Sequence, residues 1–290
     1  MRDFTIGTYN RLCAAIQELR CPVWPLRDYL RLGQPPGFAI ILRHDVDRNL
    51  DSALRLAALE ADYGFSATYY FRTTPAVFQR DAIQRVRLLN HEVGYHYEVL
   101  SKARGDRRRA AILFQHELNV FRQMAPVDTI SMHGSPLLPW HNLELWQTLD
   151  WSDYGLLGEA YLSVDYRRVY YFTDTGRGWD AHRFNIRDRV VCRRPPDPVH
   201  GTPDLIAFLR TRPAAPVIIN AHPNRWAHTD RAWFASLLTD WTANSAKFLL
   251  ALLYRALFPP LSPPPPPFPT PFSSSSPPPP PAQKPLRKGL

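Results

Sequence analysis

Cysteine is scarce in this chain, with three residues in 290, at Cys13, Cys21 and Cys192. A small and odd number argues against a disulfide-stapled scaffold and fits a reducing compartment. The first 20 residues carry several charges and no apolar core run, so they lack the features of a secretory signal peptide. These absences predict a cytoplasmic protein.

Long apolar runs are also missing. The longest, Phe248 to Phe258, spans about 11 residues and includes Arg255, whereas a membrane span needs roughly 20. No transmembrane segment is therefore expected. A core helix is the favoured interpretation of this run, and peripheral contact of its leucines with a membrane surface is the alternative.

Nucleic-acid-binding patterns are absent although the chain is basic. Its 35 Lys and Arg residues outnumber its 26 Asp and Glu residues by 9, and Lys284, Arg287 and Lys288 account for 3 of these charges. The remaining positive charge comes without a zinc-finger, basic-zipper or RNA-stacking pattern, so no nucleic acid partner is predicted. The basic run over residues 104–109 is interpreted as a solvated helix face, and a patch for phosphates or anionic sugars is the alternative.

Proline, in contrast, is concentrated in one place: half of the 30 prolines lie in residues 259–290. Such a segment cannot build a core, and its proline runs predict polyproline II structure. The predicted organisation is a helical extension over residues 1–37, a catalytic domain over 38–258, and a disordered tail over 259–290. Truncation after Phe258 is expected to leave stability and activity unchanged.

Helical and strand patterns alternate along the body of the chain. Strands are predicted over residues 38–42, 66–71, 92–96, 129–133, 169–173 and 217–221. Helices are predicted over residues 8–20, 49–64, 76–89, 107–124, 142–149, 203–211 and 230–245. This alternation indicates an α/β fold with a mostly parallel sheet. An open doubly wound sheet and an α/β barrel both fit the pattern.

Four polar clusters come at the ends of predicted strands: residues 43–47, 94–98, 131–134 and 220–225. In parallel α/β folds the carboxyl ends of the strands meet on one face, where binding and catalysis concentrate. A lone Asp there is as often a helix cap, and a lone His is more often structural. Four clusters in register favour a metal-activated hydrolase, because zinc-type metals bind carboxylates and imidazoles.

These motifs resemble the polysaccharide deacetylase superfamily, of the NodB-homology or carbohydrate esterase family 4 type, over roughly residues 38–245. The family's first motif, Thr-Phe-Asp-Asp-Gly, has the variant His44-Asp-Val-Asp47 here, and Asn90 to His96 matches the first half of the second motif. Within the superfamily the chain is similar to subgroups associated with bacterial surface-polysaccharide biosynthesis. The resemblance implies a distorted (β/α) barrel of about seven parallel strands.

The same match assigns roles in a metal site. It implies that Asp47 and His96 are metal ligands. The family's next ligand position is Leu100 in this chain, and a leucine cannot bind a metal. His133, at the following strand end, is the predicted third ligand, and Glu98 is the second choice. Zinc is the expected metal, with cobalt, nickel or manganese as alternatives.

The remaining roles concern the reaction and its substrate. By the match, Asp45 is the general base, and His222, at the family's last motif, is the general acid. Contact with the substrate is predicted for four further residues, Arg225, Trp226, Asp174 and Trp179. The expected function is removal of an N- or O-linked acetyl group from a carbohydrate. A non-catalytic glycan-binding protein and an amide or imide hydrolase are the alternatives.

Overall fold

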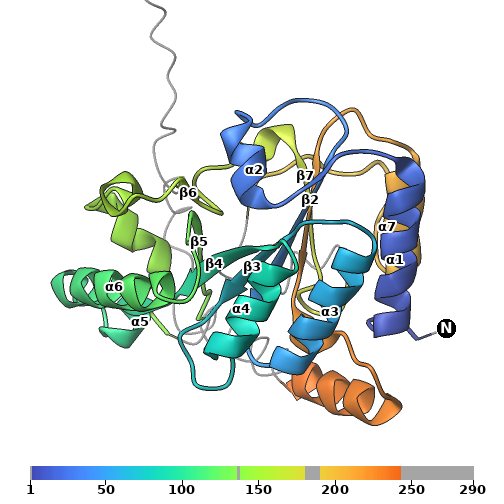
Figure 1. The fold of residues 1–290 in the computed structure, drawn as a ribbon. Helices are drawn as coiled ribbons and strands as arrows, with labels where there is room; N and C mark the ends of the chain where they lie inside the picture. Colours follow the sequence, from blue (N-terminus) through green and yellow to red (C-terminus); the bar gives the residue numbers. More distant parts are fainter. Residues whose placement is uncertain (1, 136–137, 180–189, 243–290) are drawn as a thin grey trace, which may run out of the picture. The chain divides into compact units, whose positions relative to one another are not determined.

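Parallel strands form the central sheet of the computed structural model, which describes residues 2–135, 138–179 and 190–242 (Figure 1). The eight strands of this described part are β1 (Val23–Trp24), β2 (Ile40–Val46), β3 (Thr68–Phe71), β4 (Glu92–Tyr97), β5 (Thr129–Met132), β6 (Gly158–Glu159), β7 (Tyr170–Thr173) and β8 (Val217–Ala221).

The strand order is β6-β5-β4-β3-β2-β8-β7, and β1 pairs with the start of β2. Each neighbouring pair is parallel. The seven strands curl through 207° into a half-barrel that is open between β6 and β7. The predicted distorted (β/α) barrel of about seven strands is therefore confirmed, and the flat doubly wound sheet is not the architecture.

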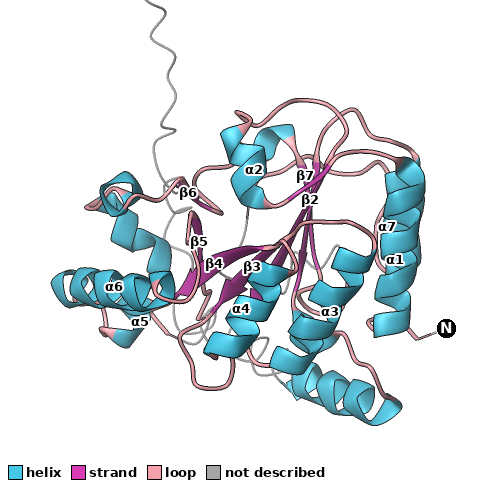
Figure 2. Ribbon diagram, in the orientation of Figure 1, coloured by secondary structure: helices cyan, strands magenta, loops and turns pink. Residues whose placement is uncertain are grey.

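Helices cover the outside of this sheet, as Figure 2 shows. They are α1 (Ile6–Leu19), α2 (Leu26–Arg31), α3 (Leu50–Asp62), α4 (Arg80–Leu88), α5 (Val99–Lys102), α6 (Arg107–Arg122) and α7 (Thr202–Arg210). Four short 3-10 helices follow from β5 onwards: η1 (Asn142–Gln147), η2 (Trp151–Tyr154), η3 (Tyr166–Arg168) and η4 (Pro223–Arg225). Side-chain caps start the longer helices; for example, Asn49 accepts a hydrogen bond from the backbone N–H of Ser52.

The strand β2 is longer than predicted. We expected it to end at residue 42, but it continues to Val46, and all seven of its residues are buried. The reason is its central place between β8 and β3, because its ladder to β3 continues as far as the pair Val46–Phe71. Most of the first polar cluster therefore lies inside the sheet.

The described residues belong to one compact unit, which spans residues 1–249. The segment predicted as an N-terminal extension contributes β1 to the sheet. Residues 230–242 are helical, in agreement with the prediction as far as the described residues extend. The predicted domain end at residue 258 and the proline-rich tail lie outside the described residues. None of the described helices is long and apolar enough to cross a membrane.

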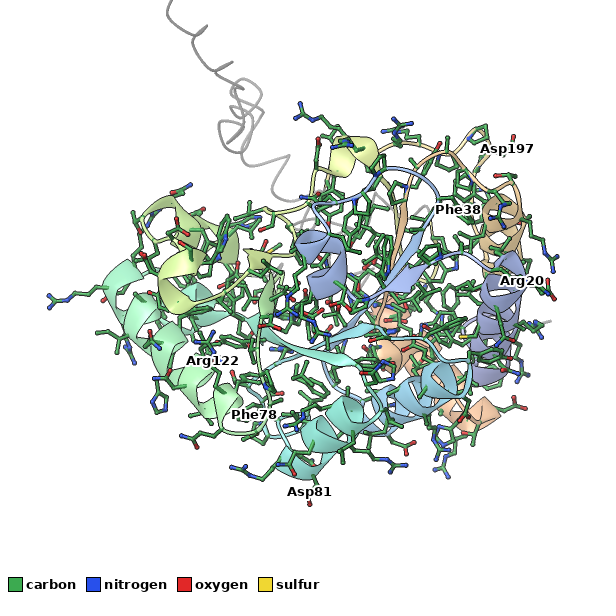
Figure 3. All side chains as sticks on the ribbon, turned by 45° about the horizontal axis from the view of Figure 1, so that its top comes forward. Arg20, Phe38, Phe78, Asp81, Arg122 and Asp197 are labelled. Atoms are coloured by element: carbon green, nitrogen blue, oxygen red, sulfur yellow. The ribbon has the colours of Figure 1, made fainter. Side chains whose placement is uncertain are left out.

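Charged side chains lie on the outer surface. Arg20, Asp81, Arg122 and Asp197 are exposed and point away from the sheet (Figure 3). The interior is built from the apolar strand residues and from aromatic rings of β3 and β4. Carboxylates that lie inside this core therefore need charged or hydrogen-bonding partners.

One such carboxylate, Glu60 of α3, faces the outer side of β2. It lies 2.7 Å from His44 Nε2 and 2.7 Å from the hydroxyl of Tyr69, and it accepts a hydrogen bond from Tyr9. Burial raises the pKa of Glu60, but the charge and hydrogen bond of His44, together with His91, outweigh burial and lower the pKa to about 2. The cluster ties α1 and α3 to β2.

Glu60→Gln should lower the free energy of unfolding by about 3 kcal/mol at pH 7, because one partner of a buried pair is removed. The pKa of Glu60 is lowered from 4.5 to about 2, so its stabilisation is present above pH 4.5 and is lost as the pH falls towards 2. Urea unfolding at several pH values should show the difference from wild type shrinking over this range.

The control is Glu18→Gln, which alters an exposed pair with Arg210 and should have little effect. A Glu60→Gln protein as stable as wild type at pH 7 would contradict this account of the cluster.

Candidate active site

The carboxyl ends of five strands bring polar side chains together at one edge of the half-barrel. Asp45 and His96 lie in β2 and β4, and Asp47 and Glu98 directly follow these two strands. His133, Asp174 and His222 directly follow β5, β7 and β8, respectively. Because all neighbouring strands are parallel, these ends face the same way. The structure thus brings residues of the four strand-end clusters together and adds Asp174, which lies outside those clusters.

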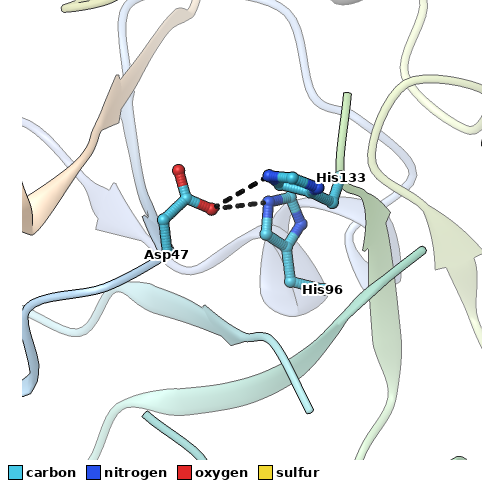
Figure 4. A group of neighbouring side chains, drawn as sticks. All are labelled: Asp47, His96 and His133. Carbon is cyan, nitrogen blue, oxygen red and sulfur yellow. Dashed lines mark ion pairs between the residues drawn. The ribbon is translucent and has the colours of Figure 1, made fainter. Parts of the chain in front are cut away.

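Three of these side chains form a group that could hold a metal ion: Asp47, His96 and His133 (Figure 4). One ligand atom from each lies within 4.8 Å of the others. Asp47 Oδ1 is 3.5 Å from His96 Nε2 and 3.7 Å from His133 Nε2. His96 is 3% exposed, whereas Asp47 and His133 are partly exposed.

Both imidazoles are held in place by contacts of their Nδ1 atoms, which are the ring nitrogens not facing Asp47. His96 Nδ1 is 3.0 Å from the carbonyl oxygen of Ser131, and His133 Nδ1 is 3.1 Å from Glu98 Oε2. His133 Nδ1 also lies 3.1 Å from Ser135 Oγ. A carbonyl and a carboxylate only accept hydrogen bonds, so Nδ1 is the donor towards Ser131 and towards Glu98. Nε2 of each ring then faces Asp47, which is the arrangement that metal-binding histidines use.

The atoms of this group and their spacing fit a metal ion. Asp47 Oδ1 is buried and has no hydrogen-bond partner among the described residues, and it converges with Nε2 of both histidines. Two ligands of a tetrahedral zinc, each with a bond of about 2.0–2.1 Å, lie roughly 3.4 Å apart. The two measured separations from Asp47 Oδ1 are close to this value. A cation would satisfy all three atoms, and three protein ligands leave a coordination position open.

Leu100 is buried in α5, and it takes no part in this group. Glu98, our second choice for the third ligand, instead contacts the outer nitrogen of His133 and pairs with Arg72. Burial raises the pKa of Glu98, but the hydrogen bond and charge of His133 and the charge of Arg72 lower it to about 2. Glu98 therefore supports the histidine that stands in the ligand group.

Glu98→Ala should weaken zinc binding about 10–100-fold, because it removes the carboxylate that orients His133. Competition with a fluorescent chelator measures this directly and requires no substrate. Glu144→Ala, which removes an exposed carboxylate paired with Arg107, is the matched control and should bind zinc as wild type does. Unchanged affinity in a folded Glu98→Ala protein would show that this carboxylate does not support the site.

Asp45 lies inside the half-barrel beside the ligand group. Arg43 Nη2 donates to both of its oxygens, at 3.1 and 3.2 Å, and Asn220 Nδ2 donates to Oδ2 at 2.9 Å. Burial raises the pKa of Asp45, but the charges of Arg43, His96 and His222 and the Asn220 bond outweigh burial and hold the pKa well below its usual range. Asp45 is thus an ionised acceptor.

Arg43 is held in place by its other contacts. It is fully buried, donates to Ser131 Oγ at 2.8 Å, and lies 4.7 Å from the ring centroid of Tyr161. Since side chains alternate along a strand, Arg43 and Asp45 share the inner face of β2 while His44 points outward to Glu60.

His222 stands between two carboxylates. Its Nδ1 is 2.6 Å from Asp174 Oδ1, and its Nε2 is 3.8 Å from Asp45 Oδ2. Asp174 also accepts from the backbone N–H of His222, from Trp226 Nε1 and from Arg225 Nη1. Four donors therefore engage both of its oxygens, and Asp174 orients His222. Its contact with a substrate stays a prediction.

The predicted substrate-contacting tryptophans have no exposed face. Trp226 is 0% exposed and packs against Phe4, and Trp179 is 1% exposed and donates to Thr202 Oγ1. Arg225 is also mostly buried because it pairs with Asp174. Both tryptophans are therefore packed in the interior, and Trp226 donates to the carboxylate that holds His222. Their contact with a substrate stays a prediction.

Three residues with clear roles here were not singled out from the sequence: Arg43, Arg72 and Asn220. Arg43 and Asn220 lie within the polar clusters, and the two-residue spacing of Arg43 from Asp45 could have placed both on one face of the strand. Arg72 follows a different strand and had no such signal. Its partner, Glu98, is known only once β3 and β4 are seen to be neighbours.

Comparison with known proteins gave no match to a family model, to a curated protein or to a solved structure.

Proposed function

We propose that this chain is a metal-dependent hydrolase that removes an acetyl group from a carbohydrate. The observation that carries the proposal is the meeting of three parts at one edge. These are a group that could hold a metal, an ionised buried carboxylate, and a histidine oriented by a second carboxylate. Hydrolysis of an amide or ester needs an electrophile activator, a base and an acid in this kind of proximity.

The base in this proposal is Asp45. It accepts the proton of the water that attacks the acyl carbon, and Arg43 keeps it ionised until then. Its Oδ1 has only the Arg43 contact, whereas Oδ2 also accepts from Asn220, so Oδ1 is the freer acceptor. A divalent metal held by Asp47 and the two histidines would supply Lewis acidity, polarising the carbonyl and lowering the pKa of water.

The acid is His222. Asp174 fixes its Nδ1, which leaves Nε2 to donate a proton to the sugar nitrogen or oxygen as the bond to the acyl carbon breaks. Acetate and the free amine or hydroxyl are the products. The carbohydrate and the acetyl group themselves rest on the resemblance of the motifs around Asp45, His96 and His222 to those of polysaccharide deacetylases, and the confirmed barrel is consistent with it.

Acetate release by the purified protein tests the proposal. Zinc-loaded protein should release acetate from N- or O-acetylated sugars, and a chelator should abolish the release. Cyclic amides and imides form the comparison panel. If the protein binds zinc but hydrolyses only the cyclic amides and imides, the function is that of an amide or imide hydrolase and the proposal is wrong. Zinc-free protein without turnover would favour a glycan-binding protein.

A further inference from the structure

A pocket of about 290 Å³ lies outside the ligand group and is not used in the reaction described above. One wall is the connection from β2 to α3, with Arg48 and Asn49, and another is Asn224 of η4. The third wall is one face of the helix over residues 230–242, drawn in orange in Figure 1, which contributes Ala232, Ala235, Ser236, Thr239 and Asp240.

Two residues that line the pocket are close in the chain to residues of the reaction site. Arg48 directly follows the ligand Asp47, and Asn224 lies two residues after His222. Small side chains on the helix, Ala232 and Ala235, leave the space open. The volume is close to the lower limit for small-molecule sites, about 300 Å³, so it suits one sugar-sized group and not a long chain.

Three unpartnered polar atoms lie in or behind the lining of this pocket. Asn224 Oδ1, which lines it, is buried without a hydrogen-bond partner in the part of the chain that the structure describes, and so are Arg177 Nη2 and Arg225 Nε. The two arginines stand behind the lining residues, since Arg177 Nη1 donates to Ser236 Oγ at 2.6 Å and Arg225 Nε is 3.8 Å from Asp240 Oδ1. Asn224 Oδ1 is an acceptor, so a hydroxyl group of a sugar could donate to it and offset part of the cost of burying it without a partner.

The charges favour an anion. Asp240 is the acidic lining residue, and its carboxylate is already neutralised by Arg177 at 3.3 Å and by Arg225. Arg48 is exposed and has no hydrogen bond or ion pair with any residue that the structure describes. The side chains of Asn49 and Asn224 add amide groups that can donate to an oxygen-rich ligand.

We propose that this pocket binds the anionic group, a carboxylate or a phosphate, of the sugar on which the enzyme acts. This inference rests on the proposed function, which it narrows to acidic or phosphorylated acylated sugars. Arg48 is the specificity-determining residue, because its guanidinium matches both oxyanions in geometry and charge. Asn224 and the helix face enclose the ring that carries the anion.

The test is a calorimetric titration of the full-length, zinc-loaded protein with glucuronate, glucose 1-phosphate and glucose. One or both anions should bind at least about 10-fold more tightly than glucose, since a hydrogen bond to a charged group contributes about 1.5–3 kcal/mol. The tighter of the two anions identifies the source of the charge. Arg48→Ala should remove this preference, and Ala235→Leu should remove binding by filling the pocket.

The control variant is Arg55→Ala, which removes a nearby exposed arginine paired with Asp51 and should bind as wild type does. The same titration with His96→Ala separates this inference from the proposed function, because anion binding should persist when a metal ligand is lost. Equal binding of glucose and the anions, or wild-type binding by Arg48→Ala or Ala235→Leu, would overturn the inference. Loss of binding in His96→Ala would place the anion at the metal instead.

Discussion

Asp45→Asn should lower the rate of acetyl hydrolysis about 1000-fold while zinc content stays that of wild type. General base catalysis contributes about 10²–10⁴-fold, and an asparagine cannot accept the proton. The ligand group does not include Asp45, so zinc binding is expected to survive the change. Acetate release and zinc content, measured on the same sample, separate these two effects.

The variant needs a check of its fold, because Asp45→Asn leaves the buried Arg43 without its charge partner. Removing one partner of a buried pair costs about 3–5 kcal/mol. The double variant Asp45→Asn/Arg43→Met removes both charges and should recover stability but not turnover. Asp165→Asn, a change at a more exposed carboxylate, is the control for both measurements. Full activity in Asp45→Asn would show that the base is another group.

His96→Ala should lower zinc affinity by more than about 100-fold, and acetate release should fall with it. The loss should exceed that of Glu98→Ala, since residues that only support a ligand cost about 10–100-fold. His116→Ala is the matched control, because His116 is exposed on α6. If His96→Ala bound zinc as tightly as wild type, the metal would be held elsewhere in the chain.

Much of the barrel could be predicted from local patterns. Continuous apolar runs at Ile40 and Val217 mark strands buried on both faces, and helical spacing marks α1, α3 and α6. The short elements β1, α2, α5 and β6 were missed, because two to six residues are too few to show a period. The true end of β2 was missed because a strand's length in the sheet depends on its neighbours.

The candidate site, like the barrel, could be predicted only in part. Asp45, Asp47, His96, His133 and His222 stood out because each follows or ends an apolar strand, and the order of the parallel strands then brings them together. Their supports could not be predicted in this way. The pair of Arg72 with Glu98, and the bonds of Asp174 to His222, join residues from different strands, so they depend on a register that no single segment encodes.

The central claim is that Asp47, His96 and His133 together bind the catalytic metal. Anomalous X-ray diffraction from crystals of the zinc-loaded protein tests it most directly. The account predicts one strong peak about 2.0–2.2 Å from Asp47 Oδ1 and from Nε2 of both histidines. The absence of a peak among these three atoms, or a peak bound by Glu98 in place of His133, would contradict it.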